Sequence, residues 1–259
     1  MRIENKFLDL KKQARSGLVT YIMAYDHDRD TAQYLLNNLP KSGADFIELG
    51  MPFSDPMADG VIIQDAAIRA LKAGAKLNNI LQMVSEFRKQ DDITPIILMG
   101  YYNPLQKYGL KRFTVDAKNA GVDAFLIVDL PPEEDDELYC ITQEHNINLI
   151  KLVTPTTDED RLRLIAKKAS GFIYYVSVAG VTGTKSASYE SVDLAIQKIK
   201  NHIKIPVAVG FGIKTKEDVK AASRYSDAVI VGSCLIKKLQ EEGKDSVLSF
   251  VRELASGLS

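Results

Sequence analysis

A glutamate inside an apolar segment is the first residue whose setting suggests chemistry. Glu48 lies in the segment Phe46-Ile-Glu-Leu-Gly, where no other side chain is polar. A carboxylate buried among such neighbours loses its hydration, so its pKa is expected to rise. A carboxyl group with a pKa near neutrality can both donate and accept protons. The alternative is an ion pair with a nearby Lys or Arg, but the position of Glu48 near the end of a predicted strand favours catalysis.

A second carboxyl group follows in a long loop. The segment after the strand reads Met51-Pro-Phe-Ser-Asp-Pro-Met-Ala-Asp-Gly, with two prolines, two aspartates and a final glycine. Long ordered loops after strands are usually functional. Asp59 lies eleven residues after Glu48, so the loop could fold back and place both carboxyl groups over one site. Asp55, directly before a proline, is more simply a turn residue.

Glycines follow the last three predicted strands and could bind an anion. They occur in the segments Gly180-Val-Thr-Gly-Thr, Gly210-Phe-Gly-Ile and Gly232-Ser233. Glycines at these places expose backbone N–H groups, and a helix that begins after Gly232 would add its positive N-terminal end. One such glycine is ordinary turn chemistry. Three in succession predict a site for a phosphate monoester.

Apolar and aromatic residues on or just after the strands could line a pocket for a flat substrate, although each could equally be core. These residues are Tyr21, Met99, Tyr101, Leu126, Leu152, Tyr174 and Phe211.

Lys151 raises a different possibility, because a buried barrel lysine can form a Schiff base with a carbonyl substrate. Side chains alternate along a strand, so Lys151 shares one face with Leu149 and Val153, while Ile150 and Leu152 share the other. If the latter pair faces the barrel interior, Lys151 lies among the helices or near the rim, and this structural role is favoured. The three histidines are scattered and show no metal-ligand spacing.

A regular alternation of strands and helices would position these residues. Short apolar runs predict eight strands, over 19–24, 46–49, 95–99, 124–128, 149–153, 172–176, 206–209 and 228–231. Helical patterns lie over 31–39, 78–87, 110–120, 133–144, 159–169, 191–202, 216–224 and from 234 onward, and an amphipathic helix over 3–13 precedes the first strand. Nearly continuous apolar strands are typical of parallel sheets buried on both faces.

The sequence therefore predicts an α/β fold, a single-domain (β/α)8 TIM barrel over residues 1–259 with an additional N-terminal helix. An open doubly wound sheet is the alternative. It would need a Gly-rich turn after the first strand, and Met23-Ala-Tyr-Asp-His has none.

Composition excludes several classes of protein. The formal net charge of −1 gives no basic stripe for nucleic acid. The apolar runs are too short to cross a bilayer, and the N-terminus lacks the apolar region of a secretory signal. Two cysteines form no disulfide framework or zinc spacing, so a cytoplasmic location is expected. The chain has no Trp, so any aromatic pocket must be built from Phe and Tyr.

Taken together, these segments resemble the tryptophan synthase alpha subunit family over nearly the whole chain. The most specific stretch is Phe46-Ile-Glu-Leu-Gly-Met-Pro-Phe-Ser-Asp-Pro-Met-Ala-Asp-Gly, and Met99-Gly-Tyr-Tyr-Asn-Pro, Gly180-Val-Thr-Gly and Gly210-Phe-Gly-Ile add independent matches. The resemblance implies cleavage of indole-3-glycerol phosphate to indole and glyceraldehyde 3-phosphate. It implies that Glu48 is the general acid–base and that Asp59 engages the indole N–H. It also assigns the phosphate site to Gly183, Gly212, Gly232 and Ser233.

The resemblance further implies a partner, a pyridoxal-phosphate (PLP) beta subunit that receives indole in an α2β2 tetramer, and no cofactor or metal in this chain. Residues 52–59 and 101–104 are the expected contact surfaces. One departure concerns the turn after the first strand, where the family often has Gly-Asp-Pro and this chain has Tyr25-Asp26-His27. Two alternatives remain: a sugar-phosphate isomerase that shares the phosphate site, and a subunit without activity of its own.

Overall fold

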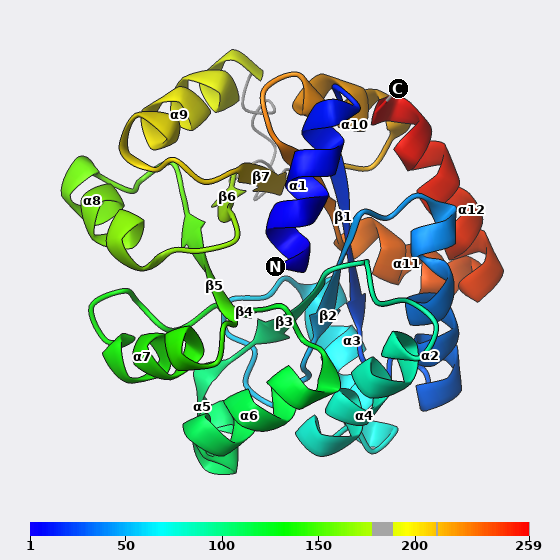
Figure 1. Cartoon of the computed structure of the whole chain (residues 1–259). Coiled ribbons are helices and arrows are strands. Elements are labelled where there is room, and N and C mark those ends of the chain that lie inside the picture. The colour runs from blue at the N-terminus through cyan, green and yellow to red at the C-terminus, as the bar shows by residue number, and fades with distance from the viewer. Residues whose placement is uncertain (178–188, 211, 259) are drawn as a thin grey trace.

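The computed structural model describes residues 1–177, 189–210 and 212–258. Within these residues, eight parallel strands close into a barrel in the order β1 to β8, surrounded by helices (Figure 1). The strands are β1 (Gly17–Met23), β2 (Phe46–Gly50), β3 (Ile96–Gly100), β4 (Ala124–Ile127), β5 (Asn148–Val153), β6 (Ile173–Val176), β7 (Val207–Gly210) and β8 (Ala228–Val231). Because β1 pairs with β8 as well as with β2, the predicted (β/α)8 barrel is confirmed and the open sheet is wrong.

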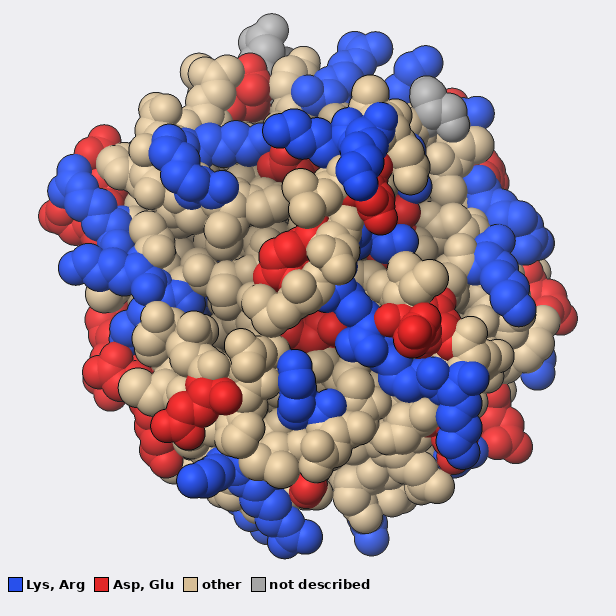
Figure 2. All heavy atoms as spheres, in the orientation of Figure 1, with Lys and Arg blue, Asp and Glu red and all other residues tan. Residues whose placement is uncertain are grey.

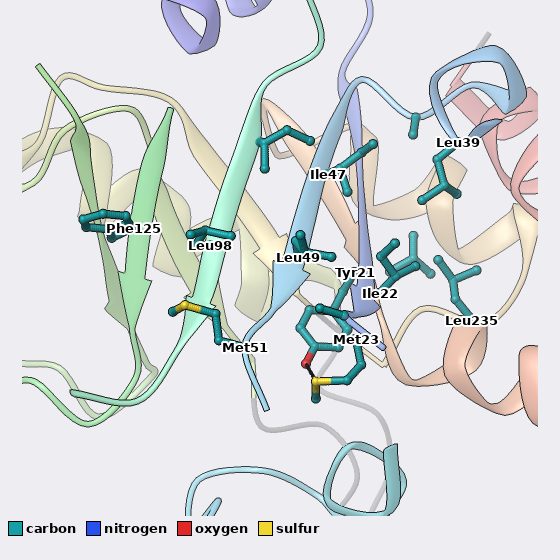
Figure 3. Close-up of a cluster of buried hydrophobic side chains, with 14 of the residues drawn as sticks. Tyr21, Ile22, Met23, Leu39, Ile47, Leu49, Met51, Leu98, Phe125 and Leu235 are labelled. Carbon is teal, nitrogen blue, oxygen red and sulfur yellow. Dashed lines mark hydrogen bonds between the residues drawn. The ribbon is translucent and has the colours of Figure 1, made fainter. Parts of the chain in front are cut away.

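Both faces of these strands are buried, for two different reasons. One face fills the barrel interior, where Phe46, Ile97, Leu126, Ile150 and Phe172 belong to one apolar cluster. The other face packs against the helices; Figure 3 shows Ile47 and Leu49 of β2 and Leu98 of β3 in this second cluster. Burial on both faces explains why the strands read as nearly continuous apolar runs.

The helices follow the strands along the chain. They are α1 (Arg2–Lys12), α2 (Arg29–Asn38), α3 (Val61–Lys72), α4 (Leu77–Arg88), α5 (Tyr102–Tyr108), α6 (Leu110–Ala120), α7 (Asp136–Glu144), α8 (Glu159–Lys168), α9 (Tyr189–His202), α10 (Lys216–Ser223), α11 (Ser233–Glu242) and α12 (Lys244–Ala255). The sequence patterns do not assign α3, α5 or α12, and α7 begins at Asp136 rather than at Glu133. No helix in the described part of the chain is both long and apolar enough to cross a bilayer.

Helix α1 lies across one end of the barrel, as the amphipathic pattern predicts (Figure 1). The ring of Phe7 packs against the rings of Phe46 and Phe172, with centroids 4.7 and 6.0 Å away. Ile3 and Leu10 are buried beside them. This helix therefore closes the N-terminal end of the barrel, opposite the end where active sites of this fold form.

Three aspartates stabilise the same N-terminal end of the barrel. Asp45, Asp123 and Asp227 each precede a strand and accept a hydrogen bond from a backbone N–H at the start of the preceding strand, at 2.8 to 2.9 Å. Gly43 and Gly121, each two residues before such an aspartate, adopt positive φ values of 105° and 95°, which glycine tolerates best. Each aspartate also pairs with a Lys or Arg, and Figure 2 shows opposite charges side by side across this face.

Candidate active site

Glu48 lies on β2 with no solvent exposure. Both of its carboxyl oxygens are buried and lack a hydrogen-bond partner within the described residues. Its strand neighbours in register are Tyr21 on β1 and Ile97 on β3. Burial raises the pKa of Glu48 to about 8, because the ionised form has lost its hydration and gained no compensating partner. The rise in the pKa of Glu48 that the sequence predicts is confirmed. Within the described part of the chain, Glu48 forms no ion pair with a Lys or Arg.

Asp59 ends the loop between β2 and α3, and Tyr101 holds it. The Tyr101 hydroxyl donates a hydrogen bond to Oδ2 of Asp59 at 2.9 Å. The same hydroxyl oxygen accepts one from the backbone N–H of Ala58 at 3.0 Å. Burial raises the pKa of Asp59, while the bond from Tyr101 opposes that rise. Asp59 is thus fixed in direction but has a higher proton affinity than an exposed aspartate.

The two carboxyl groups lie at the same end of the barrel. Charges on Asp59 and Glu48 each raise the pKa of two buried phenols, Tyr21 and Tyr174, after the larger effect of burial itself. A charge influences a neighbouring pKa appreciably only at short range inside a protein. The loop therefore folds back over the barrel mouth and brings a buried acid and a fixed aspartate into one site.

A hollow lined mostly by apolar residues adjoins Asp59. Three of the predicted pocket residues, Tyr21, Met99 and Tyr101, line it. Leu126 belongs to the interior cluster of the barrel, and Leu152 and Tyr174 pack against it; none of the three lines this hollow. Phe211 is outside the described residues. The structure adds lining residues that the sequence reasoning missed, namely Met23, Met51, Phe53 and Val128. Val128 directly follows β4, which is a place where functional residues of barrels are expected.

Two strand-end glycines make room for the buried phenols. A Cβ atom at Gly50 would lie 2.2 Å from the Tyr21 hydroxyl oxygen, and one at Gly210 would lie 2.7 Å from the Tyr174 ring. Figure 3 shows the Tyr21 ring beside Met23, whose sulfur is 3.9 Å from that hydroxyl. Because Gly50 and Gly210 have no side chain, the phenol rings of Tyr21 and Tyr174 can extend into the barrel interior.

The predicted phosphate site is described only in part. Gly183 lies outside the described residues. Gly232 is the N-cap of α11 and Ser233 is its first residue; among the described residues, no side chain caps this helix. Gly212 adopts a positive φ of 49°. A Cβ atom at Gly232 would be 3.4 Å from Cβ of Tyr21. The uncapped N–H groups of α11 thus begin next to a residue of the hollow, where an anion would find free donors.

The structure decides the open question of which face of β5 points inward: Ile150 belongs to the interior cluster and Leu152 packs against it, so Lys151, on the other face, points towards the helices. Its ammonium group forms a buried ion pair with Asp135, which has no solvent exposure. Lys168 binds the same carboxylate at 2.6 Å. Burial lowers the pKa of Lys151. A lysine paired outside the barrel cannot reach a carbonyl carbon in the hollow, so the Schiff-base alternative is wrong.

Lys151→Met tests that structural role. Removing one partner leaves Asp135 with Lys168 alone, so we expect the free energy of unfolding to fall by about 1–3 kcal/mol. Urea denaturation measures this change, and Lys168→Met is the matched variant at the same carboxylate. Catalytic turnover should stay within about twofold of wild type. A loss of turnover without a loss of stability would contradict the assignment.

The buried acid also predicts a pH dependence of stability. The pKa of Glu48 rises from an ordinary 4.5 to about 8 on folding, so between these values the folded chain binds more protons than the unfolded chain. Its contribution is fully present below the lower pKa and falls by about 1.4 kcal/mol per pH unit as the pH rises towards the upper one. Glu48→Gln removes this dependence. We expect the free energy of unfolding of the variant, minus that of wild type, to increase from pH 5 to pH 8 in urea denaturation, by about 1.4 kcal/mol per pH unit. A constant difference would contradict the burial of Glu48.

Comparisons with known proteins agree on one family. The family model described as tryptophan synthase alpha chain matches residues 7–257. The chain is similar to the alpha subunit of tryptophan synthase from Legionella pneumophila, with 37% identity, a TM-score of 0.93 and coverage of 99% of this chain and 98% of that one. It is also similar to a chain of the Pyrococcus furiosus α2β2 complex, with 37% identity, a TM-score of 0.85 and coverage of 93% and 98%. A third similar chain belongs to Mycobacterium tuberculosis tryptophan synthase, with 29% identity, a TM-score of 0.90 and coverage of 99% and 98%. With a match over almost its entire length, the chain belongs to the tryptophan synthase alpha chain family and is the alpha subunit of an enzyme.

Proposed function

We propose that this chain is a carbon–carbon lyase that cleaves indole-3-glycerol phosphate to indole and glyceraldehyde 3-phosphate. The observation that carries the proposal is Glu48, a buried carboxyl group without a partner in the described residues and with a pKa of about 8. The hollow beside Asp59 offers apolar walls for a flat ring. Family membership supplies the reaction, and the residues account for its steps.

Glu48 performs both proton transfers of the retro-aldol cleavage. At neutral pH it is mostly protonated, so it first donates its proton to C3 of the indole ring and generates a cationic leaving group. The carboxylate that remains then accepts the proton of the adjacent side-chain hydroxyl. The carbon–carbon bond breaks, its electron pair returns to the ring, and the hydroxyl carbon becomes the aldehyde. Because one proton is given and one is taken back, Glu48 ends in its starting state.

Asp59 stabilises the positive charge that develops on the ring nitrogen. Its carboxylate is held in place by the Tyr101 hydroxyl, so it need not reorient as the charge appears. Free N–H groups at the start of α11, with Gly232 and Ser233, would bind the phosphate at the other end of the substrate. Binding at this remote end holds the reacting carbons near Glu48. Proton transfer and electrostatic stabilisation suffice for this cleavage, so we assign no metal or organic cofactor to this chain.

A PLP-dependent beta subunit is the proposed partner, in an α2β2 tetramer. The similar structure from Pyrococcus furiosus is that of a tryptophan synthase α2β2 complex. In this chain, the side chain of Met57 is 85% exposed and that of Val61 is 71% exposed. Both lie at or next to residues 52–59, one of the two surfaces expected to contact the partner. Exposed apolar side chains at an expected contact surface support a protein interface there.

The decisive experiment is an assay of indole release from indole-3-glycerol phosphate, with the purified chain alone and with a beta subunit. We expect release in both cases and a faster rate in the complex. Activity on aminoaldose phosphates instead would indicate the isomerase alternative. Absence of turnover both alone and in the complex would indicate a subunit without activity of its own, and would refute the proposed function.

A further inference from the structure

We propose that Gln64 and Arg69, two residues of α3, are positioning residues that hold Asp59 in the geometry that catalysis requires. The inference rests on the proposed function for its kinetic consequences, but its structural content is independent of it. Helix α3 begins at Val61, directly after the loop that ends in Asp59 and Gly60. Any displacement of this helix therefore moves the backbone of Asp59.

Gln64 connects the first turn of α3 to the loop. Its side-chain nitrogen Nε2 donates a hydrogen bond to the backbone carbonyl of Asp59 at 2.8 Å and a longer one to that of Pro56 at 3.5 Å. The carboxylate of Asp59 is held separately by Tyr101. Asp59 is thus fixed at both its backbone and its side chain: its N–H donates to the carbonyl of Pro56 at 3.1 Å, and Gln64 holds its carbonyl.

Arg69 connects the second half of α3 to the end of β1. Its Nε donates to Oδ1 of Asp26 at 2.7 Å and its Nη2 to Oδ2 at 3.0 Å. Asp26 is only 1% exposed, so this two-bond contact is largely shielded from water. Asp65, on the same helix, also raises the pKa of Arg69. The pair therefore fixes the helix relative to the barrel wall.

The turn that carries Asp26 has an unusual backbone. Tyr25 and His27, on either side of it, both adopt a φ of 66°, a region that residues with side chains rarely occupy. Such conformations persist where surrounding contacts over-determine them, and the contact of Asp26 with Arg69 is one such constraint. Proline requires a φ near −65°, so the Gly-Asp-Pro turn of the family cannot be reproduced at His27. In this chain the aspartate makes its helix contact from this turn.

A continuous set of contacts results, from β1 through Asp26 and Arg69 to α3, and from Gln64 to the backbone of Asp59. A misplacement of about 1 Å at a catalytic group can reduce a rate by about a hundredfold. Loss of either contact should therefore lower kcat. Because other residues bind the phosphate end of the substrate, KM should change little.

Gln64→Met tests the first contact, because it preserves the shape of the side chain and removes the donor. We expect kcat for indole release to fall by about tenfold or more, with KM within about twofold. Gln64→Lys restores a donor of similar reach and should recover part of the loss. Gln33→Met is the matched control: Gln33 Nε2 donates to the backbone carbonyl of Met83 at 3.3 Å, far from the site, so kcat should not change.

Arg69→Lys tests the second contact, because it keeps the charge and removes the two-bond geometry. We expect a fall in kcat of similar size. Arg15→Lys is the matched control: Arg15 binds Asp45 by two bonds of 2.7 and 2.8 Å at the opposite end of the barrel. Both variants should lower the melting temperature, but only Arg69→Lys should lower kcat.

Hydrogen exchange measured by mass spectrometry gives a readout that does not depend on activity. In Gln64→Met, the peptide that contains residues 53–60 should exchange faster than in wild type. The loop is then no longer held at the carbonyl of Asp59, so the bond from the N–H of Ala58 to the Tyr101 hydroxyl should open more often. Three results would each overturn the proposal. The first is unchanged exchange together with unchanged kcat in Gln64→Met, and the second is a rise of KM that accounts for the whole effect. The third is an equal loss of kcat in the controls. An inactive wild type would refute the proposed function instead, and the exchange result would then decide the positioning role alone.

Discussion

Replacing Glu48 by glutamine should abolish indole release while the chain still folds. Glutamine has nearly the same shape as glutamic acid but cannot exchange a proton, so neither transfer at C3 nor at the hydroxyl can occur. Proton transfer by a positioned group contributes about 10² to 10⁴-fold to a rate, and Glu48 serves two transfers. We therefore expect kcat to fall by about 10³-fold or more. Steady-state kinetics with indole-3-glycerol phosphate measures the change.

Two controls separate loss of chemistry from loss of structure. Glu86→Gln neutralises a glutamate of α4 that pairs with Arg29 outside the barrel, and it should leave kcat unchanged. Binding of an indole analogue to Glu48→Gln, followed by ligand fluorescence against a chain with no Trp, should remain close to wild type. Turnover within about tenfold of wild type in a folded Glu48→Gln protein would refute the role of Glu48 as acid and base.

Asp59→Asn should cause the second largest loss. The amide keeps the size of the side chain but removes the negative charge that faces the ring nitrogen in the proposed mechanism. Removing one preorganised group that stabilises a developing charge typically costs about 10² to 10³-fold in kcat, and we expect a loss in that range. The measurement is kcat for indole release, with the affinity for glycerol 3-phosphate as a test of the intact phosphate end.

Asp55→Asn is the matched control for this prediction. Asp55 belongs to the same loop and is exposed, and its carboxylate accepts a hydrogen bond from the Ser54 hydroxyl at 2.5 Å rather than facing the hollow. Its variant should retain turnover. Equal losses in both variants would show that any charge change in this loop disturbs catalysis, and would remove the specific role of Asp59.

The properties of individual strands were predictable because they depend on local sequence. A strand buried on both faces needs an unbroken apolar run, and the eight runs locate β1 to β8 with boundaries within two residues. The same local reasoning applies to Glu48, since an acid with apolar neighbours on both sides has no nearby group to neutralise it. Its raised pKa follows from that setting. The period-two alternation of β5 places Lys151 on the face opposite Ile150 and Leu152, but only the structure shows which face points inward.

Contacts between distant residues were not predictable in this way. Tyr101 and Asp59 are 42 positions apart, and Arg69 and Asp26 are 43 apart, and no local pattern relates them. Tyr101 was expected as a wall of the pocket and as part of a partner contact, whereas its hydroxyl also fixes the aspartate. The partners of Lys151 were missed because Asp135 lies in an acidic run that is typical of an exposed helix start. Asp135 instead precedes α7 and is fully buried.

The sequence alone thus determined the eight strands and their order, and it singled out the two carboxyl groups and the glycines as candidates for the site. These follow from side-chain chemistry and from periodicities of a few residues. Only the tertiary structure decided which residues face the hollow, which ion pairs hold Lys151 and Arg69, and how Asp59 is oriented. Closure of the barrel brings together loops that are far apart in the chain, and the free energy of those contacts depends on distances that no single segment of sequence contains.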